Sequence, residues 1–93
     1  MNLERVYKYE LLFGDDWASI TMPAGAVPLC VQSQRGRACL WARVMVGESP
    51  VVHYFRVART GEDLGDNIGR YIGSLHLDDG ALVLHIFADG GTP

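Results

Sequence analysis

Long apolar runs are missing from this chain of 93 residues. No run approaches the roughly 18–20 apolar residues that cross a bilayer. Residues 1–10, MNLERVYKYE, also lack the apolar segment of roughly 7–15 residues that a secretory signal peptide needs. We therefore expect a cytoplasmic protein with no part in the membrane.

The chain has a small net charge and only two cysteines. The 8 Lys and Arg residues stand against 11 Asp and Glu residues, which gives a net charge of −3. This charge is too weak for a mimic of DNA and has the wrong sign for a general nucleic-acid binder. Cys30 and Cys39 form neither a C-x-x-C motif nor a zinc framework, so in a reducing cytosol we expect two free thiols.

Catalytic motifs are missing as well. The chain has no G-x-S-x-G nucleophile elbow, no P-loop and no G-x-G-x-x-G fingerprint. A cysteine and a histidine that meet only in the folded chain stay open as an alternative. Adjacent acids fall in predicted turns, where solvation explains them: Asp15-Asp16, Glu62-Asp63 and Asp78-Asp79. We expect no enzyme, no cofactor and no metal site.

What the chain does have is alternation of apolar and polar residues between turn signals, with an apolar fraction of 48%. This pattern predicts an all-β fold: a small antiparallel sandwich or partly open barrel of about six strands. Residues 1–93 form one domain, with 88–93 as a flexible tail. The expected strands cover residues 6–13, 17–22, 29–34, 37–46 and 51–59 and a last hairpin around Asp79-Gly80.

Two hairpins have a register that burial fixes. A turn at Arg35-Gly36 pairs Gln34 with Arg37, and it collects an apolar face made of Leu29, Val31, Ala38, Leu40 and Ala42. A turn centred on Asp79-Gly80 sets Leu77 opposite Leu82, Leu75 opposite Leu84 and Gly73 opposite Ile86. Tyr7, Tyr9, Leu11 and Phe13 should share one face of the first strand. Between the hairpins, residues 62–68 carry one short helical turn.

Three histidines raise the question of a metal site. In the preferred register His76 and His85 are diagonal neighbours on one face, and Asp78 lies on the same face. A zinc site needs a third or fourth ligand, and only His53 remains as an imidazole. The favoured interpretation is a half-buried histidine that is hydrogen-bonded to Ser74 or to the backbone.

A basic and aromatic cluster is the more distinctive candidate for a binding surface. Trp41 and Arg43 share the non-core face of their hairpin. Tryptophan and arginine dominate protein interfaces, and arginine also recognises phosphate. A second core layer under Trp41 with solvated arginines is the alternative. The candidate binding residues are Arg35, Arg37, Trp41, Arg43, Arg56 and Arg59.

The sequence resembles a family of small proteins of tailed phages and prophages with no assigned function. The resemblance covers most of the chain and lies in YKYEL at 7–11, MPAGAVPLCVQSQRGRACLWARV at 22–44, YFRVARTGE at 54–62 and RYIGSLHLDDGALVLHIF at 70–87. The family's usual GTG loop is Arg59-Thr60-Gly61 here. No catalytic residue is implied by this resemblance.

The resemblance implies a phage-encoded, non-enzymatic binding protein in the cytoplasm of a bacterial host. Its expected role is anti-defence: an anti-CRISPR-like inhibitor that occludes a host protein such as an immune effector. Two alternatives stay open, a module that sequesters a nucleotide immune signal and a minor virion or assembly protein. Because both faces of some strands are apolar, a homodimer or another homo-oligomer is also open.

Overall fold

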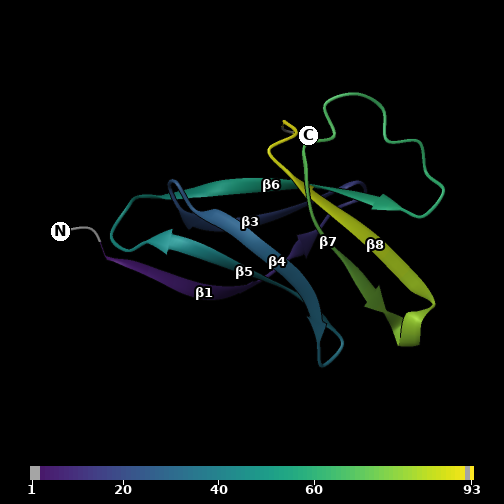
Figure 1. Cartoon of the computed structure of the whole chain (residues 1–93), viewed down its shortest axis with the longest axis horizontal. Helices are drawn as coiled ribbons and strands as arrows, with labels where there is room; N and C mark the ends of the chain where they lie inside the picture. Colours follow the sequence, from purple (N-terminus) through teal and green to yellow (C-terminus); the bar gives the residue numbers. More distant parts are fainter. Residues whose placement is uncertain (1–2, 92) are drawn as a thin grey trace.

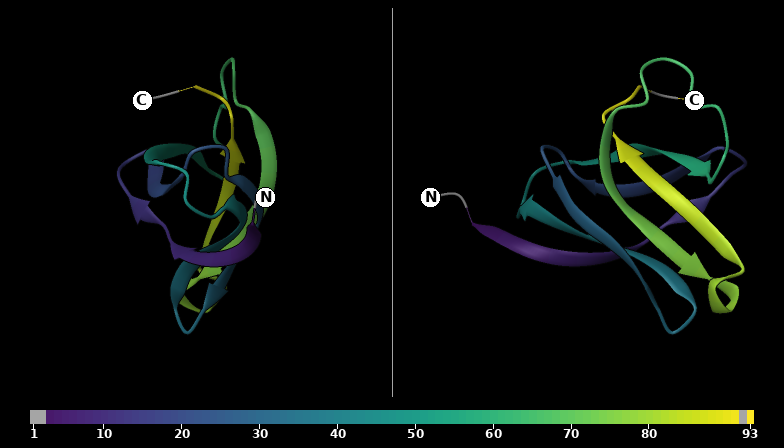
Figure 2. Two further views of the ribbon diagram at one scale, coloured as in Figure 1. Left: turned by 90° about the vertical axis from the view of Figure 1, so that its left-hand side faces the viewer. Right: turned by 45° about the vertical axis from the view of Figure 1, so that its right-hand side comes forward.

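The computed structural model describes residues 3–91 and 93, and it is an antiparallel β-sandwich of two sheets (Figures 1 and 2). A three-stranded sheet has the order β1 (Glu4–Glu10), β5 (Arg37–Met45) and β4 (Val27–Gln34). A five-stranded sheet has the order β2 (Leu12–Phe13), β3 (Trp17–Pro23), β6 (Pro50–Arg59), β8 (Leu82–Ala88) and β7 (Arg70–Leu77). The predicted all-β sandwich is therefore confirmed.

The core lies between the two sheets and takes one residue in two from the central strands. Phe55, Leu40, Leu75 and Ile86 are among its largest fully buried side chains. Burial of this kind contributes roughly 25 cal/mol per Å² of apolar surface, and it fixes which face of each strand turns inward. The alternate residues of the same strands form two outer faces, and these carry the candidate sites.

The chain passes from one sheet to the other at Leu11. Its backbone N–H donates to the Ala38 carbonyl of β5 at 3.0 Å, whereas Leu12 already pairs with Ser19 of β3. The prediction of one continuous strand over residues 6–13 is wrong for this reason. Leu11 is 4% exposed and Phe13 is 44% exposed, so the two side chains do not share a buried face.

The other margin of the sandwich is closed by β4 and β7, which lie side by side (Figure 1). A glycine permits this close approach. A Cβ atom placed on Gly73 would lie 2.9 Å from Val31 Cγ2, which is closer than real carbon contacts. The sandwich is therefore closed by the continuous chain at Leu11 on one margin and by packing at Gly73 on the other.

The β4–β5 hairpin has the predicted register, with Gln34 opposite Arg37 and Cys30 opposite Trp41. Its turn residues Arg35 and Gly36 both have positive φ, as a type I′ turn requires. The prediction that Leu29 belongs to the core is wrong. A β-bulge between Pro28 and Cys30 leaves Leu29 unpaired and 47% exposed.

The β7–β8 hairpin is also paired as predicted, with Leu77 opposite Leu82 and Leu75 opposite Leu84. Among residues 3–91 and 93, the one helical turn is a 3₁₀ turn, η1 (Asp78–Gly80), inside this hairpin. The helical turn predicted over residues 62–68 is wrong. Gly65 within this segment and Gly61 and Gly69 on either side of it have positive φ, and Asp63 Oδ1 accepts a hydrogen bond from the Gly65 N–H instead.

The end of the chain continues β8 through Ala88, which is 2% exposed. The predicted flexible tail thus begins at the last strand residue, and Thr92 within it lies outside the described residues. Within residues 3–91 and 93, no helix has the length and apolarity that a membrane crossing demands.

Candidate functional site

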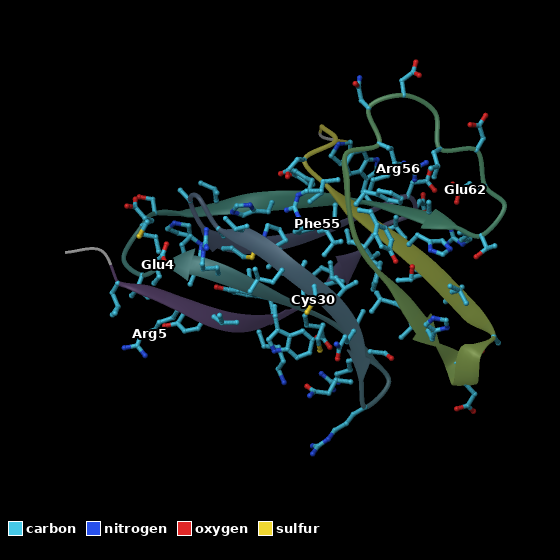
Figure 3. The ribbon with its side chains drawn as sticks, in the orientation of Figure 1. Glu4, Arg5, Cys30, Phe55, Arg56 and Glu62 are labelled. Carbon is cyan, nitrogen blue, oxygen red and sulfur yellow. The ribbon has the colours of Figure 1, made fainter. Side chains whose placement is uncertain are left out.

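The outer face of the three-stranded sheet carries the strongest candidate site. Cross-strand pairing sets Trp41 of β5 between Lys8 of β1 and Cys30 of β4, and Arg43 between Val6 and Val27. Figure 3 shows Cys30 on this sheet. We name this surface the Trp41 face, and its residues are Glu4, Val6, Lys8, Glu10, Val27, Cys30, Gln32, Gln34, Arg37, Cys39, Trp41 and Arg43.

Apolar side chains on the Trp41 face remain open to solvent. Val6 is 58% exposed, and Val27 is also exposed. Trp41 and Cys30 are half-buried by their neighbours. An aliphatic and aromatic strip therefore crosses all three strands, with Leu29 exposed at the bulge beside it.

Cations lie along this strip, and their contacts are all exposed to solvent. Arg37 Nη1 lies 3.3 Å from Glu10 Oε1, and Arg43 Nε lies 3.9 Å from Glu4 Oε1. Lys8 Nζ donates to Gln34 Oε1 at 2.7 Å. Exposed pairs of this geometry contribute roughly 0–1 kcal/mol, so the cations stay available to a partner.

The hairpin end of the Trp41 face has a cavity of ≈ 530 Å³, which lies in the ordinary size range of small-molecule sites. It is lined by Lys8, Gln34, Arg35, Arg37 and Cys39. The structure therefore brings Arg35 and Arg37 together with Lys8, which the sequence analysis did not single out. The sequence could not have identified Lys8 as a site residue, because its position opposite Trp41 depends on the β1–β5 pairing.

Arg56 and Arg59 lie on β6 in the five-stranded sheet, apart from the other four candidates. Arg56 Nη1 donates to the carbonyls of Val57 at 2.6 Å and Asp16 at 3.2 Å, and Arg56 Nη2 pairs with Glu62 at 3.6 Å (Figure 3). The Arg59 backbone N–H donates to Glu62 Oε2 at 2.7 Å. This bond and the two guanidinium groups lower the pKa of Glu62 below its usual value.

His85 is part of a chain of hydrogen bonds on the outer face of the five-stranded sheet. Its Nδ1 lies 2.7 Å from Ser74 Oγ, and its Nε2 lies 2.8 Å from Thr60 Oγ1. Ser74 Oγ in turn lies 2.7 Å from the Tyr71 hydroxyl. The predicted half-buried histidine with a hydrogen bond to Ser74 or to the backbone is confirmed, with His85 as the histidine and Ser74 as the partner, and both ring nitrogens of His85 have partners.

The other two histidines do not join His85. His53 Nε2 donates to the Pro23 carbonyl at 3.3 Å, and His76 is exposed beside Val83. Within the part of the chain that the structure describes, no three His, Cys, Asp or Glu side chains are placed to hold a metal ion together. Cys30 and Cys39 are free thiols.

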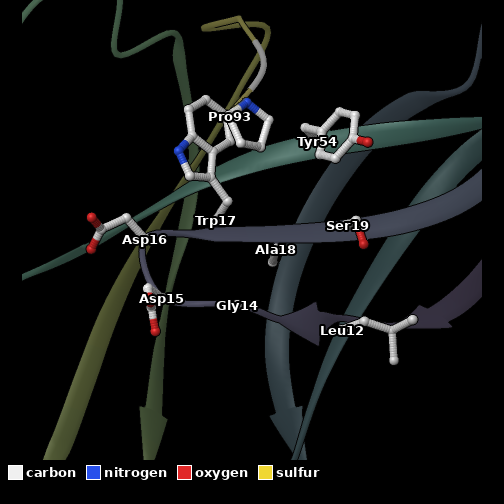
Figure 4. A pocket seen from close by; sticks show the side chains of 9 residues that line it. All are labelled: Leu12, Gly14, Asp15, Asp16, Trp17, Ala18, Ser19, Tyr54 and Pro93. Carbon is white, nitrogen blue, oxygen red and sulfur yellow. The ribbon is translucent and has the colours of Figure 1, made fainter.

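A second tryptophan marks the outer face of the five-stranded sheet, which we name the Trp17 face: Trp17, Ser19, Thr21, Val52, Tyr54 and Arg56. A cavity of ≈ 360 Å³ lies over it, with Tyr54 at one end and Asp15 and Asp16 at the other (Figure 4). The sequence alone does not connect Trp17 with Tyr54, because that needs the β3–β6 register.

Comparison with known proteins adds a family and no activity. No curated protein and no solved structure matches the chain. A model of one family, however, matches residues 2–92, which is nearly the whole sequence. The chain therefore belongs to the family described as Domain of unknown function (DUF7352).

Proposed function

We propose that this protein is a non-enzymatic binding protein that docks another protein on the Trp41 face. The observation that carries the proposal is the row in which half-buried Trp41 lies beside Cys30, next to exposed Val6 and Val27 and within a rim of cations. Protein interfaces have this composition: an apolar centre enriched in Trp and Arg, and a polar rim.

The same surface defines the chemistry of the partner. An apolar patch on the partner would cover Val6, Trp41 and Val27, and acidic side chains around that patch would meet Lys8 and Arg43. The resemblance to small proteins of tailed phages, described above, is the ground for a narrower form of the proposal. In that form the partner is a bacterial immune effector, and the protein inhibits it by occlusion in the host cytoplasm.

The test is an inhibition assay in cells with an active defence system. Cells that express the wild-type protein should lose immunity to a targeted phage, and one effector subunit should co-purify with the tagged protein. Trp41→Ala and Arg43→Glu should restore immunity and abolish co-purification, because they remove the centre and one rim charge of the surface.

Arg59→Glu is the matched control. It makes the same charge change on the five-stranded sheet and should leave inhibition and co-purification intact. Unchanged binding of both Trp41→Ala and Arg43→Glu, with Arg59→Glu also unchanged, would remove the Trp41 face from the proposal.

A second candidate function rests on the basic cavity at the hairpin end of the same face. Lys8, Arg35 and Arg37 line it without a carboxylate among its lining residues, which suits a phosphate-bearing small molecule such as a cyclic nucleotide. A nucleotide at about 100 times its Kd would add about 2.7 kcal/mol to the free energy of unfolding. A thermal-shift screen with cyclic mono- and dinucleotides decides this, and no shift with any of them rejects the candidate.

A further inference from the structure

One edge of the three-stranded sheet is formed by β1, which pairs with β5 alone among the described residues. All but one of its seven residues are exposed. An edge of this length presents unpaired N–H and C=O groups, to which another strand can add.

The direction of these groups follows from two hydrogen bonds at the ends of β1. The Leu3 carbonyl accepts from Val46 at 2.9 Å, and the Leu11 N–H donates to Ala38 at 3.0 Å. Odd-numbered residues therefore turn their backbone groups toward β5. Since this direction alternates along a strand, Glu4, Val6, Lys8 and Glu10 turn theirs toward the outer edge.

We propose that the occupant of this edge is a second copy of the same chain, whose β1 pairs antiparallel around Val6. A two-fold axis makes two identical strands antiparallel. If residue i of one copy lies opposite residue j of the other, then residue j of the first copy also lies opposite residue i of the second. Val6 then faces Val6 of the second copy, and Glu4 faces Lys8 twice. The backbone groups that turn outward form a continuous ladder across the axis.

Charge selects this register from its neighbours. An axis at Glu4, Arg5 or Lys8 would place two like charges directly opposite each other. An axis at Tyr7 would set Glu4 against Glu10 twice. The axis at Val6 gives two opposite-charge pairs and no like-charge pair within residues 3–9, and directly opposed pairs contribute roughly 0.2–1 kcal/mol each. An axis at Tyr9 would also set Lys8 opposite Glu10 twice, but it would pair only residues 7–11, because the chain leaves this sheet at Leu11.

Apolar groups on both sides of β1 favour the same arrangement. Val6, on the outer side, is the most exposed residue of the strand's apolar set, and Leu3 and Tyr7 are exposed as well. In the proposed dimer Val6 packs on its symmetry mate, Arg5 lies over Tyr7 and Leu3 meets Tyr9. The result is a six-stranded sheet in which two Trp41 faces adjoin.

The dimer goes beyond the proposed function, and its test needs no partner protein. Light scattering after size exclusion should show twice the monomer mass of 10.2 kDa at high concentration. Lys8→Glu alone and Glu4→Lys alone should each weaken association roughly tenfold or more, because two attractive pairs become repulsive. An equimolar mixture of the two variants should recover wild-type association.

Glu10→Lys provides the matched control for net charge. Mixed with Lys8→Glu it leaves one Glu–Glu pair in place and should recover association only in part. Circular dichroism should show every variant folded, since these side chains are exposed. A wild-type protein that stays monomeric at about 1 mM, or single variants that associate as well as wild type, overturns the proposal.

A crosslink reports the register directly. Opposed residues in a hydrogen-bonded pair have Cα atoms about 5.5 Å apart, which a disulfide can bridge. In a Cys30→Ser background, Val6→Cys should therefore oxidise to a covalent dimer. Lys8→Cys, whose thiols would lie opposite Glu4 of the other copy, should not. Equal crosslinking of both variants would place the contact elsewhere, even if the protein binds its partner as proposed.

Discussion

The two outer faces of the sandwich each carry one tryptophan, yet they differ in how far their polar groups are already satisfied. On the five-stranded sheet Arg56 is bound to two carbonyls and Glu62, and His85 has partners on both nitrogens. On the Trp41 face Arg37 and Arg43 each contact one exposed carboxylate, that of Glu10 or Glu4. The proposed partner surface is therefore the face of the three-stranded sheet, whose cations reach into solvent.

The largest expected effect separates the two tryptophans. Trp41→Ala should weaken binding of the partner by about 2 kcal/mol or more, which is roughly thirtyfold, because a central Trp dominates such an interface. Trp17→Ala should leave the affinity within about twofold, since a surface substitution outside an interface has little effect. Calorimetric titration with the co-purified partner measures both, and equal losses would mean that the comparison of the two faces is wrong.

Gly73→Ala tests whether the stability of the sandwich depends on the close contact between β4 and β7. The new Cβ would press on Val31, so the free energy of unfolding should fall by about 1–3 kcal/mol, as in an overpacked core. Gly14→Ala is the control, because its Cβ would meet only the Trp17 carbonyl at an ordinary 3.5 Å. Urea denaturation gives both values. If Gly73→Ala is as stable as wild type, β4 and β7 do not need this close approach.

Arg43→Glu tests how far charge on the Trp41 face controls the rate of association with the partner. The change reverses one rim charge next to Val6 and Val27, so association should slow by about tenfold and lose part of its salt dependence. Stopped-flow association rates at several salt concentrations measure this effect. A rate that Arg59→Glu slows equally would attribute the effect to net charge alone.

The smallest effect is a pH dependence on the five-stranded side. The pKa of Glu62 is lowered from 4.5, chiefly because the Arg59 N–H donates to its carboxylate. Its contribution to stability is thus present above pH 4.5 and is lost as the pH falls through the lowered pKa. Glu62→Gln should be less stable than wild type at neutral pH, and the difference should close in acid. A difference that persists unchanged at low pH would exclude this carboxylate as its source.

The local sequence pattern was sufficient to predict the register of the two hairpins but not how the hairpins are arranged in the two sheets. Leu75 and Leu84, or Val31 and Leu40, could be paired from the sequence because a slip by one residue would expose an apolar set. The switch of sheets at Leu11 and the bulge before Cys30 depend on how the sheets meet in space. For the same reason the sequence could group Arg35, Arg37, Trp41 and Arg43 but could not separate them from Arg56 and Arg59.

The bulge at Leu29 also determines where β4 can accept an insertion or a deletion. Leu29 is a supernumerary residue in its strand, because the pairing on either side of it runs on with β5 as if it were not there. Shortening the chain by that one position would keep the strand's inward pattern and reduce the apolar margin of the proposed docking surface. Lengthening it there would widen that margin. The area offered to a partner can thus be adjusted by indels at one point, while the interior keeps its composition.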